Sequence, residues 1–173
     1  WFHQSYPSLA QHLELFKVKA EKRWDKGDYW WELRACAYYD EFKKAKIIIP
    51  AIVKAASYNF DLNNNFSNDK TSIIPTDDLY LLGILNSKVS DIFLHSVAST
   101  KSGGYFEYKP MYVSQIPIRK IDITNPGEKS QHDRLVGLVQ QMLDLHKKQA
   151  AARDPRTREQ LARQIHTNDN QID

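Results

Sequence analysis

Residues 73–88 read Ile-Ile-Pro-Thr-Asp-Asp-Leu-Tyr-Leu-Leu-Gly-Ile-Leu-Asn-Ser-Lys, and residues 102–118 read Ser-Gly-Gly-Tyr-Phe-Glu-Tyr-Lys-Pro-Met-Tyr-Val-Ser-Gln-Ile-Pro-Ile. The first stretch predicts a short strand and then a helix that begins at residues 77–78, because aspartates there accept hydrogen bonds from the free amides of the first turn. An apolar face follows at helical spacing: Leu79, Leu82, Leu85, Val89 and Phe93. Ser87 and the residue before it interrupt this face. We therefore expect two helical pieces, the second capped by Ser87.

The second stretch predicts a loop and a strand. Residues 99–104 are polar and end in Gly103-Gly104, a pair that permits positive φ or the close approach of another backbone. Residues 105–109 alternate aromatic and polar side chains, which is typical of a half-exposed strand. The same region therefore supplies a core strand and an adaptable loop beside it.

Three further blocks precede these stretches: Tyr6-Pro7 with the helix behind it, Lys26-Gly27 followed by Trp30-Trp31-Glu32-Leu33-Arg34, and Lys46-Ile47-Ile48-Ile49-Pro50. In this order the blocks over residues 5–118 resemble the TaqI-like C-terminal specificity domain. That domain occurs in adenine-specific DNA methyltransferases and in fused type IIG restriction-modification enzymes. The resemblance implies a target recognition domain, which reads a DNA site while another domain carries out the chemistry.

Length and charge are compatible with this function. The chain has 173 residues, and residues 1–60 hold 10 basic and 7 acidic groups, a mild excess that suits nucleic acid. Cys36 is the single cysteine, which excludes an internal disulfide and fits a cytoplasmic protein. No run reaches the roughly 18 apolar residues that cross a bilayer, so no membrane partner is expected. The start at Trp1 suggests a piece cut from a longer protein.

The polar centre of the chain is residues 54–68, which include three consecutive asparagines at residues 63–65. An asparagine amide can donate to and accept from one adenine edge, and asparagine is equally suited to tight turns. The flanking Phe60 and Phe66 favour the turn for residues 63–65. Ser57 and Asn59 remain candidates for reading bases.

The loop at residues 101–105 is the best single candidate for contact with DNA. Small residues let backbone amides approach a phosphate, Lys101 supplies charge, and Tyr105 can reach a phosphate or a base. A flexible surface loop with a buried Tyr105 is the alternative. The DNA-binding residues expected for the whole chain are Lys54, Ser57, Asn59, Asn63, Lys101, Ser102, Gly103, Gly104, Tyr105 and Lys109.

The C-terminal part predicts a helical hairpin. Asn125-Pro126-Gly127 indicates a turn, Ser130 can cap a first helix, and Asp154-Pro155 begins a second one. Two amphipathic helices with a short linker pack on each other, on the domain or on a partner. We therefore expect two parts, a specificity domain over residues 1–123 and a helical hairpin over residues 124–173.

The sequence lacks the common motifs for cofactor binding, base extrusion and zinc binding. It has no Gly-rich site for S-adenosylmethionine, no Asn/Asp-Pro-Pro-Tyr/Phe loop for an extruded base, and no paired Cys or His at zinc spacing. Two sets nominally match a metal-dependent nuclease pattern: Asp28 with Glu41 and Lys43, and Asp91 with Glu107 and Lys109. Because Asp91 falls inside a predicted helix, we interpret Lys109 as a phosphate contact or a solvated strand end.

The sequence therefore predicts an α+β fold, a small mixed sheet with packed helices followed by the hairpin. The expected function is sequence-specific DNA recognition without catalytic residues, metal or cofactor of its own. The resemblance places S-adenosylmethionine, and Mg²⁺ where an endonuclease is fused, in the parent enzyme. Its partners would be double-stranded DNA and the methyltransferase domain. The alternative is a protein interaction or dimerisation module of a restriction-modification complex.

Overall fold

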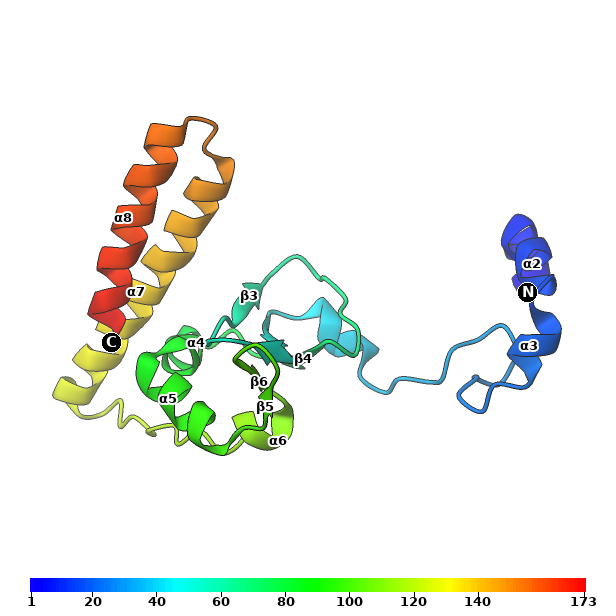
Figure 1. Cartoon of the computed structure of the whole chain (residues 1–173), viewed down its shortest axis with the longest axis horizontal. Helices are drawn as coiled ribbons and strands as arrows, with labels where there is room; N and C mark the ends of the chain where they lie inside the picture. Colours follow the sequence, from blue (N-terminus) through cyan, green and yellow to red (C-terminus); the bar gives the residue numbers. More distant parts are fainter. The chain divides into compact units, whose positions relative to one another are not determined.

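The computed structural model describes all 173 residues, which divide into two compact units, Trp1–Asp40 and Glu41–Asp173 (Figure 1). The predicted α+β class is confirmed, since helices accompany two small sheets and a pair of helices ends the chain. The strands form two antiparallel sheets in place of the one mixed sheet that we expected. None of the helices is long and apolar enough to cross a bilayer.

The first unit is built from short helices around stacked aromatic rings. Its helices are α1 (Phe2–Ser5), α2 (Pro7–Glu14) and α3 (Lys17–Glu21). The ring of Trp31 stacks on Phe2 at 5.1 Å and on Tyr29 at 4.7 Å between centroids. The guanidinium of Arg23 donates to the carbonyl oxygens of Trp30 at 3.2 Å and Glu32 at 2.7 Å. The two adjacent tryptophans therefore lie in a turn held by Arg23.

Two three-stranded antiparallel sheets form the centre of the second unit, with strand orders β3-β1-β4 and β2-β6-β5. The 3-10 helix η1 (Tyr39–Lys43) leads into the strands. Their bounds are β1 (Lys46–Pro50), β2 (Ile52–Val53), β3 (Asn59–Asp61), β4 (Thr71–Ile74), β5 (Thr100–Lys101) and β6 (Tyr105–Glu107). Ala51 joins the sheets, because its N–H donates to Lys70 at 2.9 Å and its carbonyl accepts from the N–H of Tyr108 at 2.9 Å.

The central strand β1 carries apolar and charged groups into the core. Ile47 and Ile49 are buried. Lys46 is also fully buried, and its ammonium contacts the carboxylate of Asp61 on β3 at 2.5 Å and donates to the carbonyl of Phe42 at 2.7 Å. A buried lysine is tolerated because both partners replace its water shell.

Helices α4 (Leu79–Asn86) and α5 (Lys88–Val97) begin as the sequence predicts. Asp78 caps α4 by accepting from the N–H of Leu81, and Ser87 caps α5 by accepting from the N–H of Ser90. The expectation that Val89 continues the apolar face is wrong, since Val89 is 74% exposed. The extended backbone at Ser87 breaks the helix and resets its phase, so that Ser90 and Leu94 face the core instead.

The hairpin consists of α7 (Pro126–Ala151) and α8 (Pro155–Ile172), which follow the short α6 (Pro110–Val113). Asn125 caps α7 by accepting from two backbone N–H groups, so the helix begins before Ser130, which we had expected to cap it. Asp154 caps α8 as predicted. Side by side, the two helices extend away from the sheets in Figure 1, and the loop between them lies at the far end.

The base of the hairpin packs directly on α4. A Cβ added to Gly83 would lie 2.8 Å from the Val139 side chain and 3.2 Å from Leu135, so only glycine allows α7 to approach this closely. A second link joins α5 to the end of α8, where Lys88 forms an ion pair with Asp173 at 2.6 Å. The hairpin is therefore part of the second compact unit. The functional division at residue 123 stays a prediction.

Candidate nucleic-acid interface

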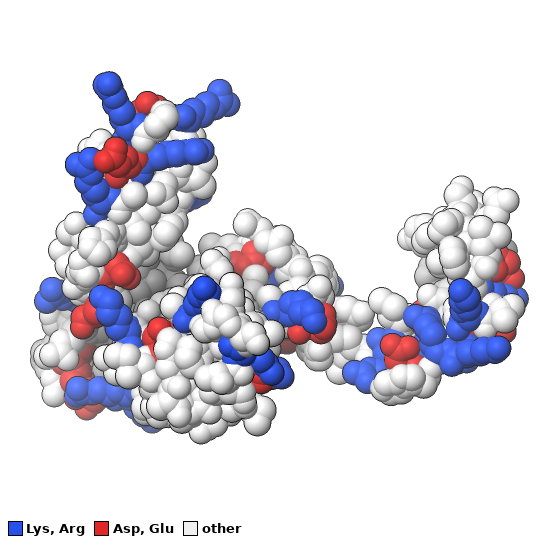
Figure 2. Space-filling model, in the orientation of Figure 1, with Lys and Arg blue, Asp and Glu red and all other residues white.

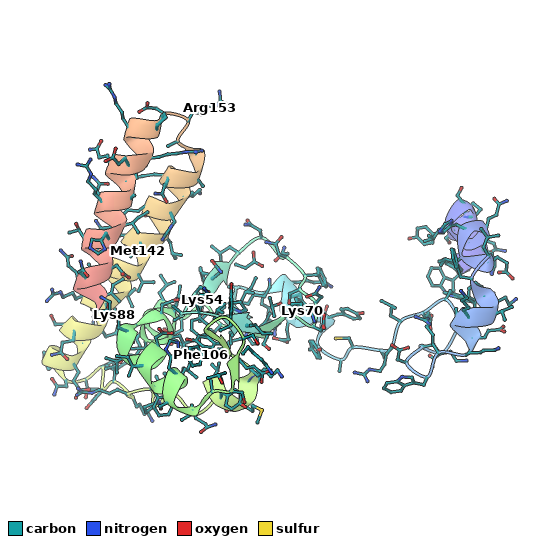
Figure 3. All side chains as sticks on the ribbon, in the orientation of Figure 1. Lys54, Lys70, Lys88, Phe106, Met142 and Arg153 are labelled. Atoms are coloured by element: carbon teal, nitrogen blue, oxygen red, sulfur yellow. The ribbon has the colours of Figure 1, made fainter.

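The sheet β2-β6-β5 brings several of the predicted DNA-binding residues together. Side chains alternate along β6, so Phe106 and Tyr108 turn inward while Tyr105 lies on the surface, 40% exposed. The ammonium of Lys54, just after β2, lies 5.1 Å from the centre of the Tyr105 ring, within range of a cation–π interaction. Figure 3 labels Lys54 and Phe106 on this part of the unit. The buried alternative for Tyr105 therefore does not hold.

Two more lysines meet at Glu107 on the same strand. The carboxylate of Glu107 lies 3.0 Å from the ammonium of Lys101 and 2.9 Å from that of Lys109. Hydrogen bonds from Lys109 and then Lys101 lower the pKa of Glu107 below its ordinary value of 4.5. Both lysine side chains are about half exposed. We call Lys54, Lys101 and Lys109 the lysine group. Together with Glu107 these residues carry three positive charges and one negative charge, so this surface attracts anions.

The loop between β5 and β6 is a tight turn. Gly103 and Gly104 have φ values of 82° and 75°, which L-residues rarely adopt, so the Gly-Gly pair is required by the backbone. Lys101 and Tyr105 pair across the turn, and Ser102 is exposed with both glycines. The sequence prediction of positive φ is therefore confirmed, and the loop lies on the surface beside the lysines.

Side chains from the helices anchor the segment 54–59. The N–H of Ala56 donates to the carboxylate of Asp91 on α5 at 2.7 Å, and the hydroxyl of Tyr108 donates to the same oxygen. Burial, and then the hydrogen bond to Asp91, raise the pKa of the Tyr108 phenol. Asp91 therefore fixes the backbone next to Lys54, whereas the nuclease pattern had suggested it as a metal ligand.

Within this segment the predicted base-reading residues Ser57 and Asn59 remain exposed. The amide of Asn59 donates to the carbonyl of Ser57 at 3.1 Å. Between them, Tyr58 is 5% exposed and stacks on Tyr108 at 6.0 Å between ring centroids. The segment thus buries the side chain of Tyr58 and exposes those of Ser57 and Asn59, on a backbone that hydrogen bonds hold in place.

Asn63 belongs to a different structural feature. The carboxylate of Asp61 accepts from the N–H of Asn63 at 3.0 Å, and from the N–H and side-chain amide of Asn65 at 3.0 and 2.8 Å. Asn64 has a φ of 57°. The turn predicted for residues 63–65 is confirmed, and Asn63 is exposed at the end of β3, with no contact to the lysine group on the other sheet.

Sequence reasoning missed how the site is supported. It treated Asn86 as an interruption of a helix face and Asp91 as a nuclease candidate, although both hold the segment 54–59. The polar Asn86 at the end of an apolar helix was the available signal. No group of three or more His, Cys, Asp or Glu side chains is placed to hold a metal ion.

Comparison with known proteins identifies the family of the segment that carries this site. Residues 8–118 match the model of the TaqI-like C-terminal specificity domain. The chain belongs to this family. Both sheets, α4, α5 and α6 of the specificity domain lie within the matched residues, whereas α7 and α8 follow them.

Two curated relatives are similar to this chain. The type II methyltransferase M.HincII of Haemophilus influenzae is 26% identical over 153 residues, covering 80% of this chain and 30% of the relative. The type II methyltransferase M.HindII of Haemophilus influenzae strain Rd is 25% identical over 154 residues, covering 80% and 29%. The chain thus spans about three tenths of the length of these relatives.

Proposed function

We propose that this specificity domain binds duplex DNA and recognises the target site of a restriction-modification enzyme. The observation that carries the proposal is the group of Lys54, Lys101 and Lys109 around Tyr105 and the Gly103-Gly104 turn. Membership of the family supports the same function. It does not favour the alternative of a module that only binds other proteins.

The lysine group is suited to phosphates and the anchored segment to bases. Lys54, Lys101 and Lys109 would bind phosphate oxygens and fix the register of the protein on the duplex, while the exposed turn at residues 102–104 offers backbone amides. Ser57 and Asn59 would contact base edges, and Asn63 would do so from the second sheet. Good bidentate contacts of this kind discriminate between bases by about 1–3 kcal/mol.

Methyl transfer would take place in another part of the parent protein. The relatives are named type II methyltransferases, so we propose that the parent transfers a methyl group from S-adenosylmethionine to an adenine in the site. The base must leave the helix to reach a catalytic pocket. The specificity domain would hold the flanking DNA during that step. An endonuclease fused to the parent would require Mg²⁺.

A salt titration tests the lysine group. The variant Lys54→Gln/Lys101→Gln removes two charges and leaves Lys109 to hold Glu107. Because each phosphate contact contributes about 0.9 to the slope of log affinity against log salt, the slope on a mixed-sequence 24-base-pair duplex should fall by about 2. The matched control is Lys120→Gln/Arg134→Gln, which removes two exposed charges from residues that are not part of the sheet.

The salt slopes show whether the lysines of the sheet contact DNA. The proposal predicts weaker binding and a smaller slope for the sheet variant only, with circular dichroism spectra unchanged for both variants. Equal slopes for the sheet variant and the wild type would show that these lysines do not contact DNA.

A further inference from the structure

The far end of the hairpin carries a second concentration of positive charge. Residues 147–163 hold six Lys and Arg against two Asp and Glu. We call four exposed members of this set the basic tip: Lys147, Lys148, Arg153 and Arg156. Figure 2 shows Lys and Arg side chains gathered at this end of the helices and extending outward. Arg153, in the connecting loop, is labelled in Figure 3.

The acidic residues near the basic tip, Asp144, Asp154 and Glu159, already have partners, and Asp144 accepts from the side-chain amide of Gln140 at 3.2 Å. Asp154 accepts from the N–H and the hydroxyl of Thr157, both at 2.8 Å, as the cap of α8. Glu159 forms an ion pair with Arg163 at 2.5 Å. No carboxylate forms an ion pair with any residue of the basic tip. The charge of the tip is therefore available to an external anion.

The hairpin holds the basic tip at a fixed distance from the sheets. Its base is fixed by the close contact between Gly83 and Val139 and by the hydrogen bond of 2.9 Å from the Asn168 amide to the Leu138 carbonyl. From Val139 to Ala151 the helix α7 rises twelve residues, or about 18 Å. That length corresponds to about five base pairs of duplex DNA.

The surface beside the tip is polar. A groove of about 700 Å³ runs between α7 and α8, and its end near the connecting loop is lined by Lys148, Gln160 and Arg163. Further along, its lining includes Gln140, Gln141 and Gln164, one carboxylate, Asp144, and a single large apolar residue, Leu145. An apolar helix would find few contacts here. The amide and cationic donors outnumber the one carboxylate, and they suit a hydrated phosphate backbone.

We propose that the basic tip binds the phosphate backbone of the same duplex, several base pairs away from the stretch held by the sheet β2-β6-β5. This inference rests on the proposed function, because it assumes that the specificity domain lies on DNA. The tip adds affinity without reading sequence, since phosphate contacts are the same for every base pair. The hairpin then acts as a second, non-specific clamp on DNA that flanks the site.

The test uses the complete 173-residue chain and the 24-base-pair duplex. The variant Arg153→Gln/Arg156→Gln removes two charges from the tip, and Lys120→Gln/Arg134→Gln is again the matched control. The proposal predicts a slope smaller by about 2 and affinity reduced by about tenfold or more for the tip variant at low salt. Combining the tip and sheet variants should reduce the slope by the sum of their separate effects. The thermal unfolding midpoints of the tip variant, the control variant and the wild type should not differ.

Each result decides between the two proposals. A normal slope for the tip variant together with a reduced slope for the sheet variant overturns the clamp and leaves the proposed function standing. Loss of binding to polyglutamate by the tip variant, with its DNA slope unchanged, would assign the tip to an acidic protein surface and overturn the clamp. A wild-type chain that binds no duplex at low salt contradicts both proposals.

Discussion

Asn86 holds the backbone of Tyr58 by two hydrogen bonds. Its Oδ1 accepts from the Tyr58 N–H at 2.9 Å, and its Nδ2 donates to the Tyr58 carbonyl at 3.2 Å. A side-chain amide thus replaces the neighbouring strand that this residue lacks. The consequence is a fixed path for the segment 54–59, which carries the candidate residues Lys54, Ser57 and Asn59.

Replacing Asn86 should loosen that segment. Asn86→Leu keeps a similar volume but leaves a buried N–H and carbonyl unsatisfied, so the free energy of unfolding should fall by about 1–3 kcal/mol. The amide of Tyr58 should also exchange its hydrogen faster. Denaturant unfolding and hydrogen exchange measure the two effects. Asn59→Ala, which removes an exposed amide, is the control and should change the stability by less than about 0.5 kcal/mol. Unchanged exchange at Tyr58 in Asn86→Leu would contradict the anchoring role.

Two glycines allow a matched test of the hairpin contact. Gly83→Ala places a methyl group 2.8 Å from Val139 and should destabilise the chain by about 1–3 kcal/mol through overpacking. Gly137→Ala, on the exposed side of α7, meets no atom within 4 Å and should stabilise the chain by about 0.5–1 kcal/mol. Thermal unfolding of both variants checks the signs. Equal effects would mean that α7 does not pack on α4 as closely as described.

The buried ion pair between Lys46 and Asp61 makes stability depend on pH. Burial raises the pKa of the Asp61 carboxyl, but hydrogen bonds from Lys46 and from the backbone of Asn63 and Asn65 outweigh it, so the pKa lies below its ordinary value of 3.8. A group whose pKa is lowered by folding stabilises the fold above its unfolded pKa. That contribution disappears as the pH falls from about 4 through the folded pKa.

Lys46→Met tests this linkage. At pH 7 the variant leaves a buried carboxylate without its cation and should lose about 3–5 kcal/mol. Below pH 4 the difference from the wild type should narrow, because protonation neutralises the Asp61 carboxylate that the variant leaves buried without its cation. Denaturant titrations at pH 7 and pH 3.5 measure the two differences. A difference that stays the same at both pH values would show that the ion pair does not account for the loss.

Patterns within one element predicted much of the fold. Asp78, Ser87 and Asp154 cap helices because the capping bond joins residues close together in the chain. The same local logic predicted the Asn64 turn and the positive φ of Gly103 and Gly104. Val89 was misplaced because a break in a helix changes which residues face the core, and the size of that change depends on the backbone at Ser87.

Contacts between distant residues could not be predicted in this way. The bond from Ala56 to Asp91 joins residues 35 positions apart, and the meeting of Lys54 with Tyr105 depends on how β2 pairs with β6. The sequence alone indicated the residue types of the candidate site. Which of them share a surface followed from the pairing of strands.

Tyr105 offers a test of the cation–π contact. Tyr105→Leu removes the ring under the ammonium of Lys54, and exposed interactions of this kind contribute about 0.5–1 kcal/mol. If the ring orients Lys54 toward phosphate, affinity for the duplex should fall about two- to fivefold. Tyr105→Phe keeps the ring and should bind within error of the wild type. Equal loss in both variants would instead assign the effect to the phenol hydroxyl.

The most direct test of the DNA-binding surface is an NMR titration of the isotope-labelled chain with a mixed-sequence duplex at low salt. We predict that the largest amide shift changes fall in residues 53–59 and 100–109 around the sheet β2-β6-β5. A smaller set is expected around residues 147–156 if the basic tip also binds. Shift changes confined to other surfaces, with residues 100–109 unaffected, would show that the sheet β2-β6-β5 does not bind DNA.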